Sequence, residues 1–174
     1  MIPAIADTQK RVCIINDSGK KYCGRLLESN GEKTAGLSGS LVAVSYPSAD
    51  ISMNFKLLKC YRSSIYVSCK FTVVKTEPEK DNYVSFYAAN GIDTSQATDS
   101  QGERYVPIQV TDAREYSKQI LTVKMIKNKP VNVYLSFDIP PATTIIKTLT
   151  LLTVAGGGDR QPVRFSNVKI YPRP

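Results

Sequence analysis

Strict alternation of apolar and polar residues runs through much of this chain and restricts it to one class of fold. In Val67–Val73 every second position holds an apolar residue or a cysteine, and Leu121–Met125 and Val131–Phe137 repeat the pattern. Successive side chains of a strand point to opposite faces, so a period of two predicts antiparallel strands with one buried face. No segment carries the apolar stripes of a helix. The chain is therefore expected to be all-β.

Strand segments follow one another from residue 41 onward, separated by turn residues. They are Leu41–Tyr46, Ile51–Cys60, Tyr66–Lys75, Tyr83–Ala88, Arg104–Val110, Gln119–Ile126, Pro130–Asp138, Ile145–Val154 and Gln161–Tyr171. Short strands at regular spacing are typical of a sandwich or barrel. We expect an antiparallel β-sandwich over residues 41–174, with a β-bulge at Ser166-Asn167, where the alternation slips by one.

The four cysteines form two local pairs, Cys13 with Cys23 and Cys60 with Cys69. A three-residue turn at Asp17-Ser18-Gly19 places the first two cysteines opposite each other. A turn centred on Ser64-Ile65 does the same for the second two. Directly opposed residues of antiparallel strands are close enough for a disulfide, so two disulfides are expected. Reduced core cysteines remain the alternative, whereas the ligand spacing of a zinc site is absent.

The N-terminal segment suggests export. Ile2-Pro3-Ala4-Ile5-Ala6-Asp7 contains Ala-x-Ala before an acidic residue, which is typical of the end of a signal peptide. Together with two disulfides it predicts a periplasmic, lumenal or extracellular protein. The expected organisation is a residual signal-peptide end (1–6), a small cystine hairpin (7–28), a Gly- and Ser-rich linker (29–40) and the sandwich domain (41–174).

The formal net charge of +8 is concentrated in the last third of the chain. From Lys118 onward there are nine basic residues against two acidic ones. Four side chains of this region, Lys124, Tyr134, Lys147 and Arg164, could share one outer sheet face and bind an anionic partner. A solvated sheet face without a partner is the alternative, because no basic run exceeds two residues.

Catalytic chemistry finds little support in the composition. The chain has no histidine, which removes the imidazole base, the histidine-activated nucleophile and the imidazole metal ligand. Ala155–Asp159 lacks the lysine and the helix of a phosphate loop. The acidic loop Asp93–Glu103 lacks calcium-loop spacing, so Asp99 is interpreted as a turn former. We expect no metal, no cofactor and no enzyme, with a hydrolase of dispersed acidic residues as a third-ranked alternative.

A family resemblance accompanies these patterns. Asp99, Gly102 and Tyr105 have the spacing Asp-x-x-Gly-x-x-Tyr, and Val131–Phe137 runs into Asp138-Ile139-Pro140. This arrangement resembles bacterial exported immunoglobulin-like domains over about residues 50–171. The resemblance implies an immunoglobulin-like sandwich with an accessory or binding role and carries over no catalytic residues.

The expected function is therefore binding. We expect a non-catalytic exported subunit, binding or structural, that contacts another protein or an assembly through a sheet face or edge. The alternative is a module that binds a polyanion or an anionic surface through the basic C-terminal face. No stretch is apolar enough to span a membrane, and export argues against nucleic acid as the partner.

Overall fold

The computed structural model describes residues 11–15, 21–25, 41–64, 66–77, 82–89, 94–156 and 158–173. The chain divides into two compact units, Met1–Ala35 and Gly36–Pro174. In the first unit, β1 (Arg11–Ile15) and β2 (Lys21–Arg25) pair antiparallel with Cys13 opposite Cys23, which is the predicted register. The side chains of these two cysteines lie outside the described residues, and so do the signal-peptide end and the linker.

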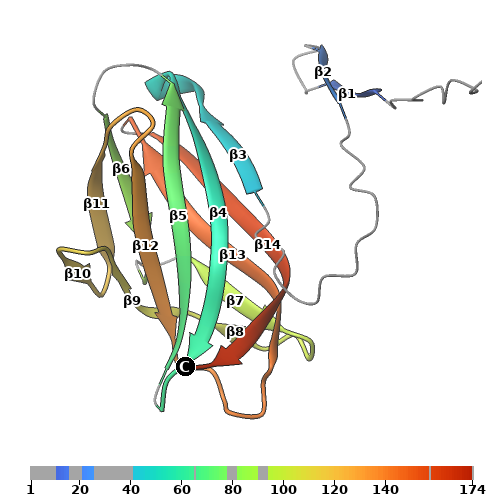
Figure 1. Cartoon of the computed structure of the whole chain (residues 1–174), viewed down its shortest axis with the longest axis vertical. Coiled ribbons are helices and arrows are strands. Elements are labelled where there is room, and N and C mark those ends of the chain that lie inside the picture. Colours follow the sequence, from blue (N-terminus) through green and yellow to red (C-terminus); the bar gives the residue numbers. More distant parts are fainter. Residues whose placement is uncertain are drawn as a thin grey trace, which may run out of the picture. The chain divides into compact units, whose positions relative to one another are not determined.

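The second unit consists of strands and one 3-10 turn, with no α-helix among its described residues (Figure 1). Its elements are β3 (Leu41–Tyr46), η1 (Pro47–Ala49), β4 (Ile51–Arg62), β5 (Val67–Glu77), β6 (Asn82–Tyr87), β7 (Gln96–Asp99), β8 (Arg104–Tyr105), β9 (Pro107–Thr111), β10 (Tyr116–Ser117), β11 (Ile120–Met125), β12 (Pro130–Phe137), β13 (Ile145–Ala155) and β14 (Asp159–Pro172). The all-β prediction is confirmed. No helix in the described part of the chain is long and apolar enough to cross a membrane.

These strands form one curled sheet. Its main strand order is β10-β9-β12-β5-β4-β14-β13-β6-β11, with β3 paired to β4 and β7 to β13. The curl brings β11 close to β9 and β10, but no hydrogen-bonded ladder joins these ends among the described residues. The result is an open half-barrel (Figure 1). The finer prediction of an immunoglobulin-like sandwich is not confirmed by this arrangement.

The long strand β14 connects the two layers of the curled sheet. From Asp159 to Lys169 it pairs antiparallel with β13, and from Ile170 to Pro172 it runs parallel to β4. In Figure 1, β13 and β14 pass behind β4 and β5. The last residues of β14 therefore lie beside the hairpin that carries the second cysteine pair.

The prediction of a β-bulge in β14 is wrong. The burial pattern does slip at Asn167, but Ile146 still faces Val168 and Thr148 still faces Ser166, so no extra residue is inserted between β13 and β14. Asn167 instead adopts a left-handed conformation with φ 54°, which asparagine tolerates better than most residues. In β13 and β14 the alternation of buried and exposed residues shifts at the same place along the ladder. The register shift lies between β13 and β7.

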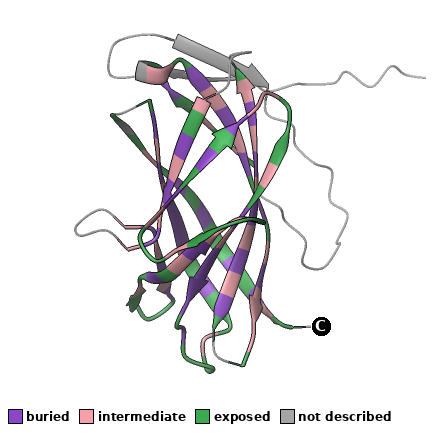
Figure 2. Cartoon of the chain, turned by 90° about the vertical axis from the view of Figure 1, so that its left-hand side faces the viewer, coloured by how far each residue is buried: buried purple, intermediate pink, exposed green. Residues whose placement is uncertain are grey.

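Side chains from the inner faces of the curled sheet form the core. Figure 2 shows buried residues alternating with less buried ones along the strands, as the period of two predicts. Phe55, Phe71, Phe86 and Phe137 are fully buried, and the ring centroids of Phe71 and Phe165 are 5.5 Å apart. Because these apolar side chains point inward, the polar residues that alternate with them lie on the outer face.

The second cysteine pair is bonded as predicted. Cys60 and Cys69 lie opposite each other on β4 and β5, form a disulfide, and have Cα atoms 3.9 Å apart. Both are completely buried on the inner face of the sheet. A disulfide of this kind is typical of proteins from oxidising compartments. Because alternate residues point the other way, the neighbours of these cysteines must lie on the outer face.

Candidate functional site

Lysine and tyrosine side chains gather on the outer face of β14, β4, β5 and β12. Lys59 of β4 lies opposite Lys70 of β5, and Lys70 lies opposite Tyr134 of β12. One row further along, Tyr61 of β4 lies opposite Tyr171 of β14. We call this set the lysine–tyrosine face; it comprises Lys59, Tyr61, Lys70, Tyr134, Lys169 and Tyr171.

Each lysine of the face stands over a tyrosine ring. The Lys59 Nζ atom is 4.8 Å from the ring centroid of Tyr61 and 4.5 Å from that of Tyr171. Lys70 Nζ is 5.6 Å from the Tyr134 centroid, and Lys169 Nζ is 5.3 Å from the Tyr171 centroid. These distances lie within the range of cation–π attraction, about 6 Å. The rings therefore hold the ammonium groups in defined positions on the sheet.

The charge on this face is not balanced by acidic residues. Lys59 and Lys70 form a directly opposed like-charge pair, which destabilises a sheet. In the described strands β3, β4, β5, β9 and β12 the only carboxylate is Glu77. It lies at the far end of β5, where its Oε2 atom is 3.5 Å from Lys127 Nζ. Asp138 directly follows β12, but among the described residues no ion pair joins it or another carboxylate to Lys59, Lys70 or Lys169, so the repulsion between these lysines is not offset by ion pairing.

A hollow of about 410 Å³ opens in the face between two of its tyrosines. Tyr61, Ser63, Ser68, Tyr134 and Arg173 line it. The hydroxyl of Ser68 is hydrogen-bonded to that of Ser136, with 2.7 Å between the two Oγ atoms. Ser63 Oγ is used locally, since it donates to the carbonyl oxygen of Tyr66 and accepts from the Tyr66 N–H.

Two arginines close to Tyr61 have different roles, and of the two only Arg173 lines the hollow. The guanidinium of Arg62 donates to the carbonyl oxygens of Ile139, Pro140 and Thr143 at 2.7–3.0 Å, so it fixes the loop before β13. Arg173 follows β14, where its backbone N–H donates to the Arg62 carbonyl oxygen at 3.1 Å. Its side chain is exposed at the rim of the hollow. Arg62 therefore has a structural role, whereas Arg173 is an exposed residue that lines the hollow.

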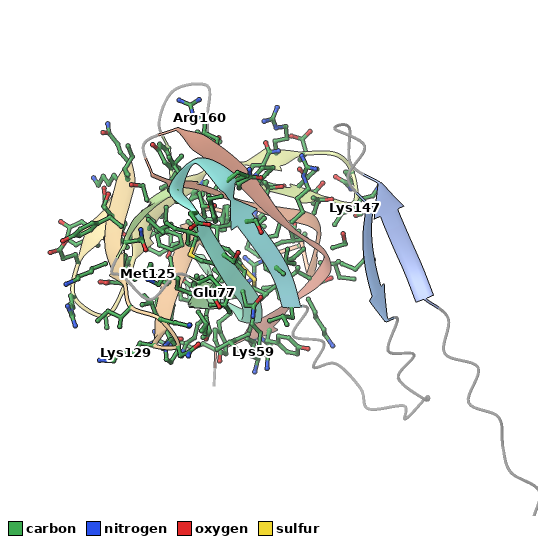
Figure 3. All side chains as sticks on the ribbon, turned by 90° about the horizontal axis from the view of Figure 1, so that it is seen from above. Lys59, Glu77, Met125, Lys129, Lys147 and Arg160 are labelled. Carbon is green, nitrogen blue, oxygen red and sulfur yellow. A yellow bond between two sulfur atoms is a disulfide. The ribbon has the colours of Figure 1, made fainter. Side chains whose placement is uncertain are left out.

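The four side chains proposed from sequence as an anionic-partner face are not brought together. Tyr134 lies on the lysine–tyrosine face, with Lys70 over its ring. Lys124 of β11 lines a hollow with Asp112 and Glu115, whereas Lys147 of β13 lines a different hollow at the other end of the curled sheet. Arg164 is exposed on β14, opposite Thr150. In Figure 3, which looks along the long axis, Lys59 and Lys147 are labelled on different sides.

Sequence reasoning missed Lys59, Tyr61 and Lys70, although a signal for them was present. Once Cys60 and Cys69 are placed opposite each other, the same register places Lys59 opposite Lys70 and Tyr61 opposite Ser68. Alternation then assigns all four to the outer face. The neighbours from β12 and β14 depend on strand order, which no local pattern predicts.

Asp99 is confirmed as a turn former. Its Oδ1 atom accepts hydrogen bonds from the backbone N–H groups of Gln101 and Glu103 at 2.9 and 3.0 Å, and Tyr105 donates its hydroxyl to Oδ2 at 2.9 Å. Gly102 supplies the positive φ of the turn, 91°. Burial opposes the charged form of Asp99, but these hydrogen bonds hold its pKa below the ordinary value.

The largest of the described hollows lies beside this turn. It measures about 820 Å³ and is lined by Asp99, Glu103, Lys147 and the loop before β13, among others. The Asp99 carboxylate is occupied by internal hydrogen bonds and has a lowered pKa, so it is unsuited to act as a general acid. In the described part of the chain no cluster of three or more His, Cys, Asp or Glu side chains could hold a metal ion.

Comparison with known proteins adds no relative. No protein-family model matches the chain, and no curated protein matches its sequence.

Proposed function

We propose that this protein is a non-catalytic exported binding module whose lysine–tyrosine face contacts an anionic macromolecule. The observation that carries the proposal is the adjacency of Lys59, Lys70 and Lys169 on one face, where no ion pair joins them to a carboxylate among the described residues. Such an arrangement costs folding free energy, because opposed like charges repel. An anionic partner removes that repulsion on binding and is attracted to the face over a longer range.

The tyrosines make this face better suited to binding than scattered surface lysines. A free lysine loses side-chain entropy when a partner immobilises it, at a cost of about 0.5–1.5 kcal/mol per side chain. On this face the ammonium groups already stand over tyrosine rings at 4.5–5.6 Å, so part of that cost has been met during folding. This preorganisation favours the lysine–tyrosine face over the dispersed Lys124, Lys147 and Arg164.

The proposal includes the compartment of the protein and its relationship to immunoglobulin-like domains. Export is supported by the buried Cys60–Cys69 disulfide, since such bonds persist in oxidising compartments. An immunoglobulin-like relationship, with its accessory or binding role, is supported by the all-β fold and by the Asp99–Tyr105 turn. A partner that is a component of an envelope or of an extracellular matrix fits both.

Two matched triple variants test the role of the face. Lys59→Gln/Lys70→Gln/Lys169→Gln and Lys124→Gln/Lys147→Gln/Arg164→Gln each lower the formal net charge from +8 by three, to +5. At about 1 kcal/mol for each lysine at an anionic surface, the face variant should bind heparin about 100-fold more weakly at low salt. The matched variant should elute from a heparin column only slightly earlier than the unmodified protein.

Thermal melts and an alkylation assay of the disulfide would confirm that both variants are folded. Equal losses of heparin binding in the two variants would reject the lysine–tyrosine face as the binding surface. The same conclusion would follow if the salt dependence of binding were identical in both variants, because each contact with an anion contributes to that dependence.

A further inference from the structure

We infer that the hollow between Tyr61 and Tyr134 binds one sugar of an anionic glycan, a sugar that carries a carboxylate or sulfate group. The inference rests on the proposed function and names the class of its ligand. The hollow measures about 410 Å³, which lies within the range of about 300–1,000 Å³ for small-ligand sites. It is therefore large enough for a single sugar ring, with the rest of the glycan lying along the face.

Hydroxyl groups dominate the polar lining of this hollow. Tyr61 and Tyr134, both half-buried, line the hollow and each carries a hydroxyl group. The Ser68 hydroxyl bonds only to Ser136, and a hydroxyl can both donate one hydrogen bond and accept two. A sugar ring carries hydroxyls with the same double capacity. The lining of the hollow is thus chemically matched to a sugar ring.

Arg173 supplies the charge recognition at the rim. A guanidinium binds carboxylate or sulfate oxygens through two parallel N–H···O bonds, which gives geometric specificity as well as attraction. The backbone hydrogen bond from Arg173 to Arg62 holds this residue beside the end of β4. The Lys59 and Lys70 ammonium groups, which also stand over Tyr61 and Tyr134, can contact charged groups on the neighbouring sugars.

The same geometry disfavours the two other anionic polymers. Single-stranded nucleic acid binds by stacking its bases on exposed aromatic faces, but a lysine already covers one face of each of these rings. An acidic peptide is most readily held by pairing with an open sheet edge. Tyr61 and Tyr134 lie on β4 and β12, which have paired strands on both sides.

Calorimetric titration of the full chain tests the ligand class. The probes are a hyaluronan tetrasaccharide (carboxylate), a heparin tetrasaccharide (sulfate), an uncharged chitin tetrasaccharide, an eight-residue oligothymidylate and an octaglutamate. We expect one of the two anionic tetrasaccharides to bind at least tenfold more tightly than each of the other three probes, and the tighter one identifies the charged group. Tighter binding of the oligothymidylate or the octaglutamate would overturn the inference.

Variants that keep the charge of the lysines locate the site. Tyr61→Phe/Tyr134→Phe removes only two hydroxyls and should weaken tetrasaccharide binding about tenfold, and Arg173→Gln should have a similar effect. The matched control is Tyr83→Phe/Tyr116→Phe, at tyrosines that are 64% and 73% exposed elsewhere on the surface. It should leave binding unchanged.

The outcomes separate this inference from the proposed function. If the lysine variant loses heparin binding while the tyrosine and Arg173 variants bind the tetrasaccharides normally, the sugar site is rejected and the anionic face stands. If the lysine variant also binds heparin normally, both are rejected. Because tyrosine-to-phenylalanine changes at these half-buried positions preserve packing, loss of binding in a folded variant supports the sugar site.

Discussion

Tyr46 shows how the core accommodates a polar group. The side chain is fully buried, and its hydroxyl is hydrogen-bonded to that of Thr153. Thr153 in turn donates to the carbonyl oxygen of Gln161 at 3.0 Å, so Tyr46 acts as the donor to Thr153. Burial of the Tyr46 hydroxyl raises its pKa from the ordinary value of 10.0 to about 12.

This raised pKa predicts a loss of stability in alkali. The folded state keeps the Tyr46 proton up to about pH 12, whereas the unfolded chain releases it near pH 10. The burial of protonated Tyr46 therefore adds its full contribution to the free energy of unfolding below pH 10. That contribution falls by about 1.4 kcal/mol per pH unit as the pH rises toward 12. Denaturant melts between pH 9 and pH 12 measure this slope, which is to be compared with that of Tyr46→Phe.

The phenylalanine variant should lose about 1 kcal/mol of stability at pH 7, because one buried hydrogen bond is missing. Above pH 10 its stability should fall less steeply than that of the unmodified protein. If the two proteins lose stability in parallel throughout the alkaline range, Tyr46 is not the group that titrates.

At the scale of single elements, the β4–β5 hairpin carries both the disulfide and the centre of the lysine–tyrosine face. Met53, Phe55 and Leu57 point inward at every second position, and a register shift at Leu58 then returns Cys60 to the same inner face. Such a bulge bends a strand and re-aims the side chains that follow it. Lys59 and Tyr61 therefore point outward because of the shift at Leu58.

Removing the disulfide should weaken the whole second unit. The bond closes a loop with a sequence separation of 9, for which chain entropy gives about 2–3 kcal/mol. We expect Cys60→Ala/Cys69→Ala to lower the free energy of unfolding by about that amount in urea melts. Cys13→Ala/Cys23→Ala is the control and should leave the melt of the second unit unchanged. Equal losses in the two variants would mean that the first hairpin contributes to the core.

The individual elements were largely predictable from alternation. The expected Leu41–Tyr46 coincides with β3, and most of the other expected strands differ from the observed ones by a few residues at their ends. The short strand β7 was missed because Ala97 is the one apolar residue in Gln96–Asp99, too little for a periodic signal. Its pairing with β13 is a tertiary preference that no local pattern contains.

The candidate site was predictable only in part. The disulfide register already implies the opposition of Lys59 and Lys70, whereas the positions of Tyr134 and Tyr171 require the strand order β14-β4-β5-β12. The excess of positive charge lies in the last third of the chain, but its basic residues are divided among several strands. Proximity in sequence does not measure proximity on a curled sheet.

At the scale of the whole molecule, the uncompensated lysines predict a response of stability to salt. Raising NaCl from 0.02 to 0.5 M shortens the screening length to a few Å and weakens the repulsion on the face. The melting temperature of the unmodified protein should rise by about 2–4 °C, which corresponds to about 1 kcal/mol for a chain of this size.

The same matched variants separate local repulsion from net charge. The salt-induced rise should be much smaller in Lys59→Gln/Lys70→Gln/Lys169→Gln and nearly intact in Lys124→Gln/Lys147→Gln/Arg164→Gln. An equal decrease in both would attribute the effect to the overall charge of +8 and remove one support for the binding face.

The position of β14 has a consequence for how the protein is made. Among the described strands it comes last in the chain, and it alone is hydrogen-bonded both to β13 and to β4. During synthesis, the strands that precede β14 are made before the strand that joins the two halves of the curled sheet, so their apolar inner surfaces stay uncovered until β14 is complete. Exposed strands of this kind are prone to aggregation. We therefore expect the nascent chain to depend on a holding chaperone until Ile170–Pro172 emerge, and to fold in one late step that joins the two halves.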